Sequence, residues 1–463
     1  MILRIIYNIH VPTRDKEHII NEMLKKDSLK RRYFTSQKIM LNFVHMKKFL
    51  IFFALSCAVS GANGAMPENT NVEEPQFDEY FCDTTLRIDY EMSGDIRTQH
   101  IAIDELCRSP HWYGRRHHLN ELPIEGNGQI TMRDHKSGRI IYRTSFSTLF
   151  QEWLAYPEAN HTQRSFENVF IMPMPKDTAD VTIDLRNYQR EIMTTMTHQV
   201  VPNDILIRHI GEKDVTPWEV IQLPRDTTRC IHLAYMAEGY QPEEMGKFIN
   251  DAHRATDAIF SHEPFKSMRD RFYIVAVKSP SKESGAGEPG KGIWKNTALG
   301  SHWDTFYSER YLTTSNLRRM HDWLAGIPYE HIIALVNSKR YGGGGIYGEY
   351  LLSTIDNEHS KPVVVHEFGH SFCGLADEYA YEGEQVPMYP TNVEPWEKNI
   401  TTKVNFKGKW ENIPDAGFYE GAGYTLKGVW RAYPDCRMRT NENPHFCKAC
   451  QKAIKDFIDF YTK

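Results

Sequence analysis

The stretch Val363-Val-Val-His-Glu-Phe-Gly-His-Ser-Phe-Cys-Gly-Leu-Ala-Asp-Glu-Tyr379 contains the pattern that decides how this sequence folds. It includes His-Glu-x-x-His, from His366 to His370. Residues four apart on an α-helix lie on one face, so both imidazoles can reach one metal ion. Pro362 and three valines precede the pattern and favour a buried helix, which Gly374 can end. The sequence therefore predicts a metal-binding helix; the alternative is a helix whose histidines merely cap a core.

The residue types in this pattern suit zinc and hydrolysis. Zinc takes two or three neutral imidazoles plus an oxygen ligand and keeps one position open for water. Glu367, one step round the helix, can take a proton from that water and relay it. Hydrolysis of a peptide bond needs these parts. The prediction is Zn2+ as cofactor, His366 and His370 as metal ligands, and Glu367 as the catalytic base.

A third metal ligand is expected after the chain reverses at Cys373 and Gly374. In metzincins the third ligand comes six residues after the second histidine, behind a glycine at the third position. Here both the glycine and the first acid come one residue later, as if one residue were inserted. This spacing favours Asp377 as the third ligand, with Glu378 as the alternative. Either acid could instead orient a ligand histidine without touching the metal.

Several stretches resemble the bacterial IgA peptidase family of zinc metallopeptidases. They are His366 to Tyr379, the later Cys436-Arg-Met-Arg with Phe446-Cys-Lys-Ala-Cys450, and the upstream run Phe146 to Leu154, which is similar to the family's N-terminal domain. The resemblance covers the chain from about residue 78 to its end. It implies a secreted, zinc-dependent endopeptidase, and it does not identify immunoglobulin A as the substrate of this chain.

Two residues beyond the helix are candidates for the same site. Met438, in Asp435-Cys-Arg-Met-Arg439, resembles the Met-turn that lies beneath the metal in metzincins; a lone methionine is otherwise ordinary core. Tyr424, in Gly421-Ala-Gly-Tyr424, is a candidate catalytic residue that would stabilise the oxyanion. The alternative for Tyr424 is a packing residue in a glycine-rich turn.

A glycine-rich segment directly before the metal helix predicts a strand that binds substrate. The edge strand of a zincin sheet pairs its free backbone groups with an extended peptide. This role is assigned to Gly345 to Leu352, with Gly345, Ile346, Tyr347 and Gly348 as the substrate edge strand. The alternative is that the glycines only relieve crowding at a corner of the sheet.

Composition and patterning give the domain organisation. The 463 residues are 41% hydrophobic and 25% charged, as in a soluble globular protein, and the net charge of −5 gives no reason to expect nucleic acid. Short alternating runs predict an N-terminal β-sandwich over residues 81–200, preceded by a polar linker at 66–80. Strands and helices over 201–463 predict the catalytic domain. The expected fold class is α+β: a β-sandwich followed by a zincin- or metzincin-like metallopeptidase domain with a mixed twisted sheet.

The N-terminus has the pattern of an exported protein. Residues 46–65 have a basic start, a short apolar run and small residues, which is typical of a signal peptide. Met46 is then the expected start, and residues 1–45 a non-native or disordered extension that comes from an upstream reading frame; the alternative is a genuine N-terminal helical arm. Cys57 is a weak match to a lipid-attachment site, whereas cleavage after Ala62 or Ala65 would release a soluble enzyme. The expected location is secreted, periplasmic or on the cell surface.

The eight cysteines stand at 57, 82, 107, 230, 373, 436, 447 and 450. Export permits disulfides. Cys436, Cys447 and Cys450 could form a disulfide with a spare thiol or part of a structural zinc site. Because a structural zinc wants four ligands and only three cysteines lie close together in sequence, the disulfide is favoured.

The combined prediction is a zinc endopeptidase that acts on extracellular proteins or glycoproteins, such as host immunoglobulin or mucin-type glycoproteins. The alternative is an exported adhesin or glycan-binding protein on a zincin scaffold. Because both histidines and Glu367 are intact, the sequence gives no sign of a dead site. Membrane attachment is expected only through a lipid on Cys57.

Overall fold

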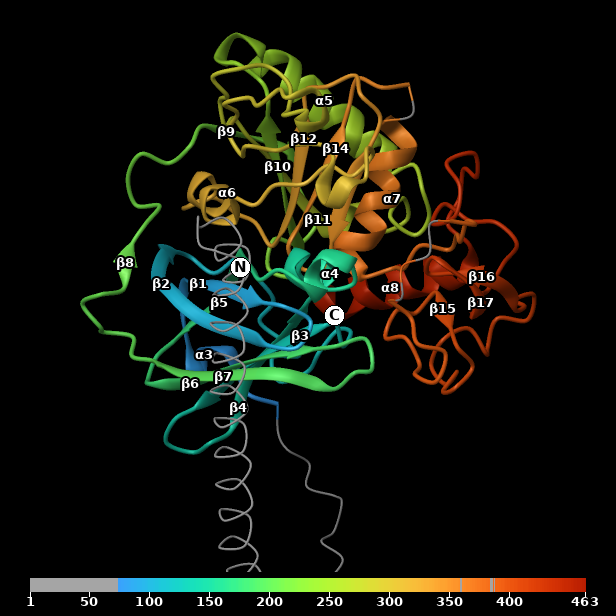
Figure 1. Cartoon of the computed structure of the whole chain (residues 1–463). Coiled ribbons are helices and arrows are strands. Elements are labelled where there is room, and N and C mark those ends of the chain that lie inside the picture. Colours follow the sequence, from blue (N-terminus) through green and yellow to red (C-terminus); the bar gives the residue numbers. More distant parts are fainter. Residues whose placement is uncertain (1–73, 359, 384–385, 387) are drawn as a thin grey trace, which may run out of the picture. The chain divides into compact units, whose positions relative to one another are not determined.

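The structure is a computed structural model that describes residues 74–463 except 359, 384–385 and 387. Its elements form an α+β fold with two regions, an N-terminal pair of sheets and a C-terminal mixed sheet with helices (Figure 1). The predicted extension at 1–45 and signal peptide at 46–65, with Cys57, lie outside the described residues. Of the predicted linker at 66–80, residues 77–80 instead form the helical turn α3 (Phe77–Tyr80), because Phe77 is buried against Phe81.

The N-terminal region consists of two four-stranded sheets. The order in the first sheet is β5-β1-β2-β8 and in the second β4-β3-β6-β7. The short helix α4 (Leu149–Trp153) follows β4, and its first turn is capped by Thr148, whose side chain accepts a hydrogen bond from the backbone of Gln151. The strands are β1 (Phe81–Gly94), β2 (Gln99–Pro110), β3 (Gly128–Asp134), β4 (Ile140–Phe146), β5 (Arg164–Pro175), β6 (Ala179–Arg186), β7 (Ile192–Val200) and β8 (Arg208–His209).

Alternation along the strands gives the two sheets a common core. In β6 the residues Ala179, Val181, Ile183 and Leu185 are buried while their neighbours are half-exposed. They belong to the same buried cluster as apolar residues of β1 in the other sheet. The region is therefore a β-sandwich, and β8, beyond the predicted boundary at residue 200, extends its first sheet.

The C-terminal region is built on a six-stranded mixed sheet of order β13-β14-β12-β10-β11-β9. β10 pairs in parallel with β11 and β12, and β12 pairs in parallel with β14, whereas β13 and β9 run antiparallel to their neighbours. The strands are β9 (Trp218–Gln222), β10 (Ile231–Glu238), β11 (Phe272–Val277), β12 (His331–Val336), β13 (Gly343–Ile346) and β14 (Tyr350–Thr354).

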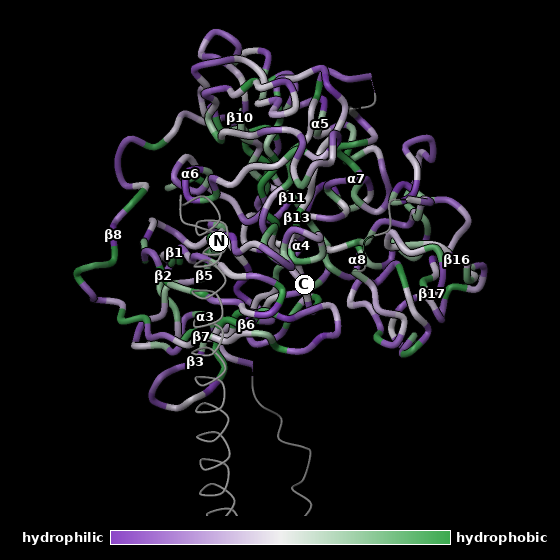
Figure 2. The backbone as a smooth tube through the Cα atoms, viewed as in Figure 1, coloured by the Kyte–Doolittle hydropathy of each residue, from purple (hydrophilic) through white to green (hydrophobic). Residues whose placement is uncertain are grey.

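Two different layers cover the faces of this sheet. Alternate residues of β10, such as Leu233 and Tyr235, pack with the helices α5, α7 and α8, while Ala234 and Met236 share the core of the sandwich and α6. Hydrophobic residues accordingly follow the sheet strands and α7, and the outer loops are largely hydrophilic (Figure 2). The helices are α5 (Met245–Ile259), α6 (Leu317–Trp323), α7 (Ser360–Cys373) and α8 (Lys448–Thr462).

The observed edge strand is shorter than predicted. β13 is the edge of the sheet, but it ends at Ile346, and Tyr347 and Gly348 lie in the turn that leads into β14. Leu351 and Leu352 belong to β14, which lies inside the sheet between β13 and β12. The assignment of Tyr347, Gly348 and Leu352 to an edge strand was therefore wrong, because the glycines make a hairpin rather than one long strand.

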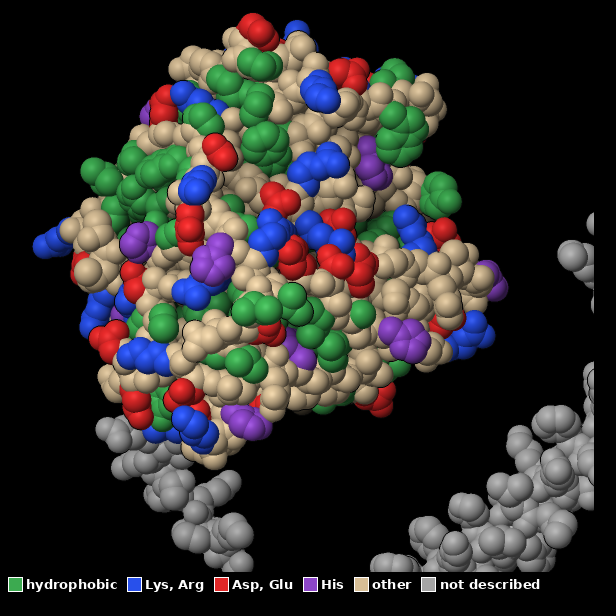
Figure 3. All heavy atoms as spheres, turned by 90° about the vertical axis from the view of Figure 1, so that its left-hand side faces the viewer, with side chains coloured by type: hydrophobic (Ala, Val, Ile, Leu, Met, Phe, Trp, Pro, Cys, Tyr) green, Lys and Arg blue, Asp and Glu red, His purple; other side chains and the backbone are tan. Residues whose placement is uncertain are grey.

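A smaller sheet lies between α7 and α8 in the sequence. It has the order β15-β17-β16, with β15 (Ile400–Thr401), β16 (Tyr419–Ala422) and β17 (Thr425–Arg431). No helix among the described residues is both long and apolar enough to cross a lipid bilayer. On the face drawn in Figure 3, basic and acidic side chains are interspersed rather than separated into large single-sign areas.

Candidate metal centre

His366 and His370 lie one turn apart on α7, and their Nε2 atoms are 3.0 Å from each other. α7 ends where Gly374 takes a φ of +61°, a conformation that favours glycine. The bend carries Asp377 back to the helix, where its Oδ1 lies 3.0 Å from His366 Nε2 and 3.3 Å from His370 Nε2. Three ligand atoms from a stretch of twelve residues therefore converge on one point.

Backbone carbonyls set the orientation of both imidazoles. His366 Nδ1 donates to the carbonyl oxygen of Arg437 at 3.1 Å, and His370 Nδ1 donates to that of Leu375 at 2.5 Å. A carbonyl can only accept, so Nδ1 carries a proton in each ring, and Nε2 is the atom that faces Asp377 and is available to a metal. This is the arrangement that orients histidine ligands of metals.

The electrostatics of the three residues favour a cation between them. Burial opposes the ionisation of Asp377, but His370 and His366 hold the pKa of its carboxyl well below the usual range. Burial also opposes charge on His370, yet Asp377 raises the pKa of His370 to about 9. Asp377 Oδ1 is buried and, apart from the two ring nitrogens, has no partner among the described residues. Two imidazoles and one carboxylate with a free oxygen fit a divalent transition metal.

Glu367 lies beside this cluster, along the edge strand. A Cβ placed on Gly343 of β13 would come within 2.9 Å of Glu367 Cγ, so the glycine makes room for this side chain. Burial raises the pKa of Glu367 above its ordinary value, although His366 and His370 oppose that shift. A carboxylate with a raised pKa is a better proton acceptor near neutral pH.

Tyr424 lies at the cluster rather than away from it. Its hydroxyl donates to Asp377 Oδ2 in a short hydrogen bond. Gly423 and Tyr424 form the two-residue loop between β16 and β17, and both have a φ of +57°. Such a loop normally takes Asn-Gly, and a tyrosine with positive φ is strained. The hydroxyl is therefore placed to orient the carboxylate of Asp377.

Met438 lies directly under the metal helix. It is fully buried, and a Cβ placed on Gly369 would lie 2.7 Å from its sulfur. Gly369 stands between the two histidines, so the absence of a side chain there lets Met438 approach the helix. The preceding residue, Arg437, supplies the carbonyl that orients His366.

Glu378 points away from the two histidines. It is fully buried, and its Oε1 lies near the thiols of Cys447 and Cys450, with Cys436 in the same group. Of the two acids considered as third ligand, the structure thus brings Asp377 to the histidines and Glu378 to the cysteines. The seven described cysteines are free thiols, so the preference for a disulfide among Cys436, Cys447 and Cys450 was wrong.

Sequence reasoning missed a carboxyl group that the sandwich brings to the site. Glu152, on α4, accepts a hydrogen bond from Tyr311 at 2.5 Å, and its charge interacts with His370, Asp377 and Glu367. Burial raises the pKa of Glu152 to about 7. The only signal was the run Phe146 to Leu154, which carried no chemical role by itself.

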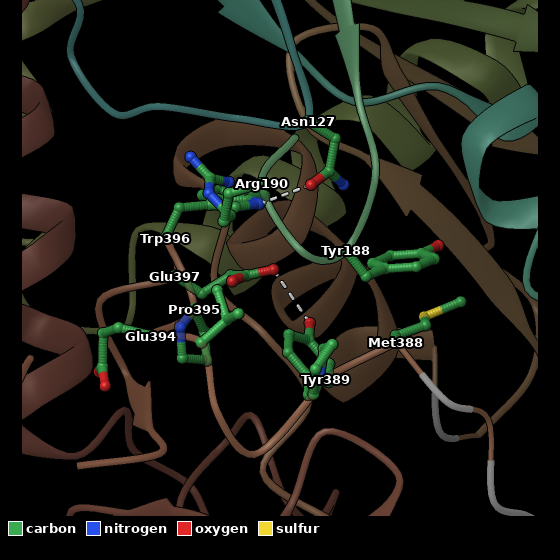
Figure 4. Close-up of a pocket in the computed structure, with 11 residues that line it drawn as sticks. Asn127, Tyr188, Arg190, Met388, Tyr389, Glu394, Pro395, Trp396 and Glu397 are labelled. Carbon is green, nitrogen blue, oxygen red and sulfur yellow. Dashed lines mark hydrogen bonds between the residues drawn. The ribbon is translucent and has the colours of Figure 1, made fainter. Parts of the chain in front are cut away.

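A pocket between the sandwich and the C-terminal region borders this site (Figure 4). Trp396 donates to Asn127 at 2.8 Å across it, and Tyr389 donates to Glu397 at 3.0 Å. A Cβ placed on Gly423 would come within 2.4 Å of the ring of Tyr389, so the pocket lies against the loop that holds Tyr424. The lining residues are Asn127, Tyr188, Arg190, Met388, Tyr389, Pro390, Val393, Glu394, Pro395, Trp396 and Glu397.

Comparison with known families places the chain among peptidases. The family model for IgA Peptidase M64 matches residues 220–416 and 411–458, and that for the Peptidase M64 N-terminus matches residues 76–197. The chain belongs to the IgA Peptidase M64 family. The resemblance inferred from His366 to Tyr379 is thereby confirmed. No curated protein matches the chain.

Proposed function

We propose that the chain is a zinc-dependent endopeptidase of the zincin class that is exported and cleaves extracellular proteins or glycoproteins. The observation that carries the proposal is the convergence of His366, His370 and Asp377 on one point, with Glu367 beside it on the same helix. Family membership supports a metallopeptidase. Immunoglobulin, which the family's name contains, and mucin-type glycoproteins are the first substrates to test.

His366, His370 and Asp377 would hold the zinc ion. A zinc ion in such a set polarises a carbonyl oxygen and makes water a nucleophile near neutral pH. Glu367 would accept the proton of the attacking water and deliver it to the nitrogen of the leaving amine. Its raised pKa suits both transfers, because the group must take up a proton and release it within one turnover.

Tyr424 and β13 would position the reacting groups. Tyr424 holds Asp377 by a hydrogen bond, so the carboxylate presents Oδ1 to the histidines. β13 is the sheet edge closest to Glu367, and it can pair with an extended peptide only over a short length. The carbonyl of Gly343 already accepts a hydrogen bond from Leu312 at 3.2 Å, and that of Tyr347 accepts one from Ser147 at 2.8 Å. The backbone of Gly345 between them is the expected contact.

Cleavage of casein by the purified full chain tests the proposal. We expect cleavage that a chelator abolishes and zinc restores. Glu367→Gln should retain the metal while kcat falls by about 10²–10⁴-fold, the usual contribution of general-base catalysis. His366→Ala should lose both metal and activity. Normal turnover by Glu367→Gln, or cleavage that is insensitive to the chelator, would contradict the mechanism.

A further inference from the structure

A second cluster of metal-ligating side chains lies outside the site already described. It brings together Glu378, from the turn after α7, Cys436, from the loop after β17, and Cys447 and Cys450, at the start of α8. One ligand atom from each lies within 4.8 Å of the others. Three thiols and one carboxylate make four ligands, which is the number that a structural zinc site requires.

The distances in this cluster fit a shared ion better than a disulfide. Cys436 Sγ and Cys450 Sγ are 3.7 Å apart, whereas a disulfide bond is about 2.05 Å long. Two thiolates bound tetrahedrally at about 2.3 Å from zinc lie about 3.8 Å apart. Glu378 Oε1 is 3.0 Å from Cys450 Sγ and 3.9 Å from Cys447 Sγ, which brackets the sulfur–oxygen distance of about 3.5 Å expected around the same ion.

The cluster is buried, and the nearby Arg431 donates its hydrogen bonds to backbone carbonyls rather than to Glu378. Glu378, Cys436 and Cys450 are fully buried. Glu378 Oε1 accepts a hydrogen bond from Asn399 at 3.1 Å, but its Oε2 has no partner among the described residues. A buried carboxylate is costly unless it is paired or coordinates a metal. The unsatisfied oxygen therefore points to a cation as the missing partner.

Burial opposes a negative charge on Cys436 and Cys450, so the thiolate form depends on the groups that contact the sulfurs and on the metal itself. The backbone N–H of Cys447 donates to Cys436 Sγ at 3.1 Å. Cys447 is the N-cap residue of α8 and Cys450 lies in its first turn, where the helix dipole stabilises negative charge. Cys-x-x-Cys at the N-terminus of α8, together with Cys436 eleven residues before Cys447, thus supplies three soft ligands close to one point.

We infer that Glu378, Cys436, Cys447 and Cys450 bind a second zinc ion, which is structural. Thiolates select zinc over the hard cations magnesium and calcium, and four protein ligands leave no open position for water. This site is distinct from the His366 cluster and does not depend on the proposed peptidase activity.

The second ion would fix the positions of Asp377, Arg437 and Met438 at the first site. Glu378 directly follows Asp377, and its backbone N–H donates to the carbonyl of Met438 at 2.8 Å. Cys436 directly precedes Arg437, whose carbonyl orients His366. An ion held between Glu378 and Cys436 therefore ties the chain that carries Asp377 to the loop that carries Arg437 and Met438.

Metal analysis of the full chain, purified without chelator, tests the inference. We expect two zinc ions per wild-type chain and one in His366→Ala/His370→Ala. We expect loss of the thiolate-bound ion in Cys436→Ser/Cys450→Ser, and Cys107→Ser, which alters a buried cysteine of the sandwich, should keep both. Cobalt provides a second readout, because only the thiolate site gives a thiolate-to-cobalt charge-transfer band. That band should persist in His366→Ala/His370→Ala.

These measurements also distinguish a metal site from a disulfide, and they give a result even if the serine variant does not fold. If Cys436→Ser/Cys450→Ser does not fold, the wild type and His366→Ala/His370→Ala still decide by metal content and by the cobalt band. A single zinc in the wild type that disappears with the histidines would overturn the inference. So would intact-mass and thiol-labelling data that show Cys436, Cys447 or Cys450 in a disulfide in freshly purified protein.

Discussion

Asp377 and Glu378 are consecutive residues whose carboxylates point into two different clusters. Asp377 faces the nitrogens of His366 and His370, and Glu378 faces three thiols. The two residues follow α7 in a segment outside helices and strands, and this one segment supplies a carboxylate to each cluster. Exchange of the two acids would therefore not be a conservative change at either position.

Tyr424→Phe tests whether the hydroxyl orients a ligand or contacts the reacting carbonyl. The change removes the hydrogen bond to Asp377 Oδ2 and keeps the ring. If the hydroxyl orients Asp377, metal affinity should fall by about 10–100-fold, as for other residues that support metal ligands. Titration with a competing chelator measures this affinity. A fall of kcat with unchanged metal affinity would contradict that role and assign the oxyanion role instead.

At the scale of elements, the distance between β13 and α7 determines where Glu367 lies. A Cβ placed on Gly345 would lie 2.5 Å from the carbonyl oxygen of Glu367 and 3.3 Å from Cβ of His370. The strand can thus contact the helix only because this position is glycine. Contact between backbone and backbone leaves no flexible side chain to move aside.

Gly345→Ala should separate β13 from α7 and lower both stability and activity. Overpacking of this kind costs about 1–3 kcal/mol of the free energy of unfolding. Gly246→Ala is the control, because Gly246 lies in α5 with no atom within 4 Å of a Cβ placed there. Alanine in a helix should stabilise by up to about 1 kcal/mol. Urea unfolding and kcat/KM are measured for both; unchanged values for Gly345→Ala would refute the close contact.

The imidazole of His331, at the start of β12, should make the protein less stable in acid. Its ring packs against Phe372 of α7, with centroids 4.8 Å apart, and Nε2 has no partner among the described residues. Burial lowers the pKa of His331 to about 4 from 6.5. The unfolded chain therefore binds this proton at higher pH than the folded one, and stability should fall as the pH decreases from about 6.5 to about 4.

His331→Phe should remove this part of the acid sensitivity, because phenylalanine keeps an aromatic ring and cannot ionise. Thermal unfolding at pH 7.5 and pH 5 measures it, with the shift in Tm between the two pH values as the readout. His253→Phe, on an exposed position of α5, serves as the control. An equal Tm shift in wild type and His331→Phe would show that His331 is not desolvated.

The parts of the fold that the sequence predicts are those with local periodicity. The helix α7 and the alternating strands of the sandwich match their predictions, because the patterns that indicate them are local in the sequence. The sequence did not predict that β13 and β14 form a hairpin, because glycines hide the alternation of apolar and polar residues on which strand prediction depends. The sequence did not predict the cluster of Glu378 with the three cysteines. Glu378 lies far from Cys436, Cys447 and Cys450 in sequence, so a count of nearby cysteines gave only three ligands.

At the scale of the whole molecule, the sandwich and the C-terminal sheet form one core. Ala234 and Val336 of the large sheet belong to the same buried cluster as Leu86 and Ile183 of the sandwich. The sandwich also places Glu152 near the metal cluster and lines the pocket with Asn127, Tyr188 and Arg190. The N-terminal region is therefore part of the site rather than a separate module.

Glu152→Gln tests this joint construction in chelator-treated full-length protein. Burial raises the pKa of Glu152 to about 7 from 4.5, so its ionisation opposes folding. The unfolded chain releases this proton at lower pH than the folded chain does. The wild type should therefore lose stability as the pH rises from about 4.5 to about 7. Glutamine accepts the same hydrogen bond from Tyr311 without a charge. The variant should therefore not show the loss of stability that ionisation of Glu152 causes in the wild type.

The measured quantity is the difference in Tm between pH 5 and pH 8 for each protein. The Tm of Glu152→Gln should exceed that of the wild type at pH 8 and equal it at pH 5. The control is Glu79→Gln, at an exposed position of α3, whose Tm should equal that of the wild type at both pH values. The direction is opposite to that of His331, so the two groups can be separated by pH in one set of unfolding curves. A Tm for Glu152→Gln that parallels the wild type would mean that water reaches this carboxyl, and that the sandwich does not close over the site.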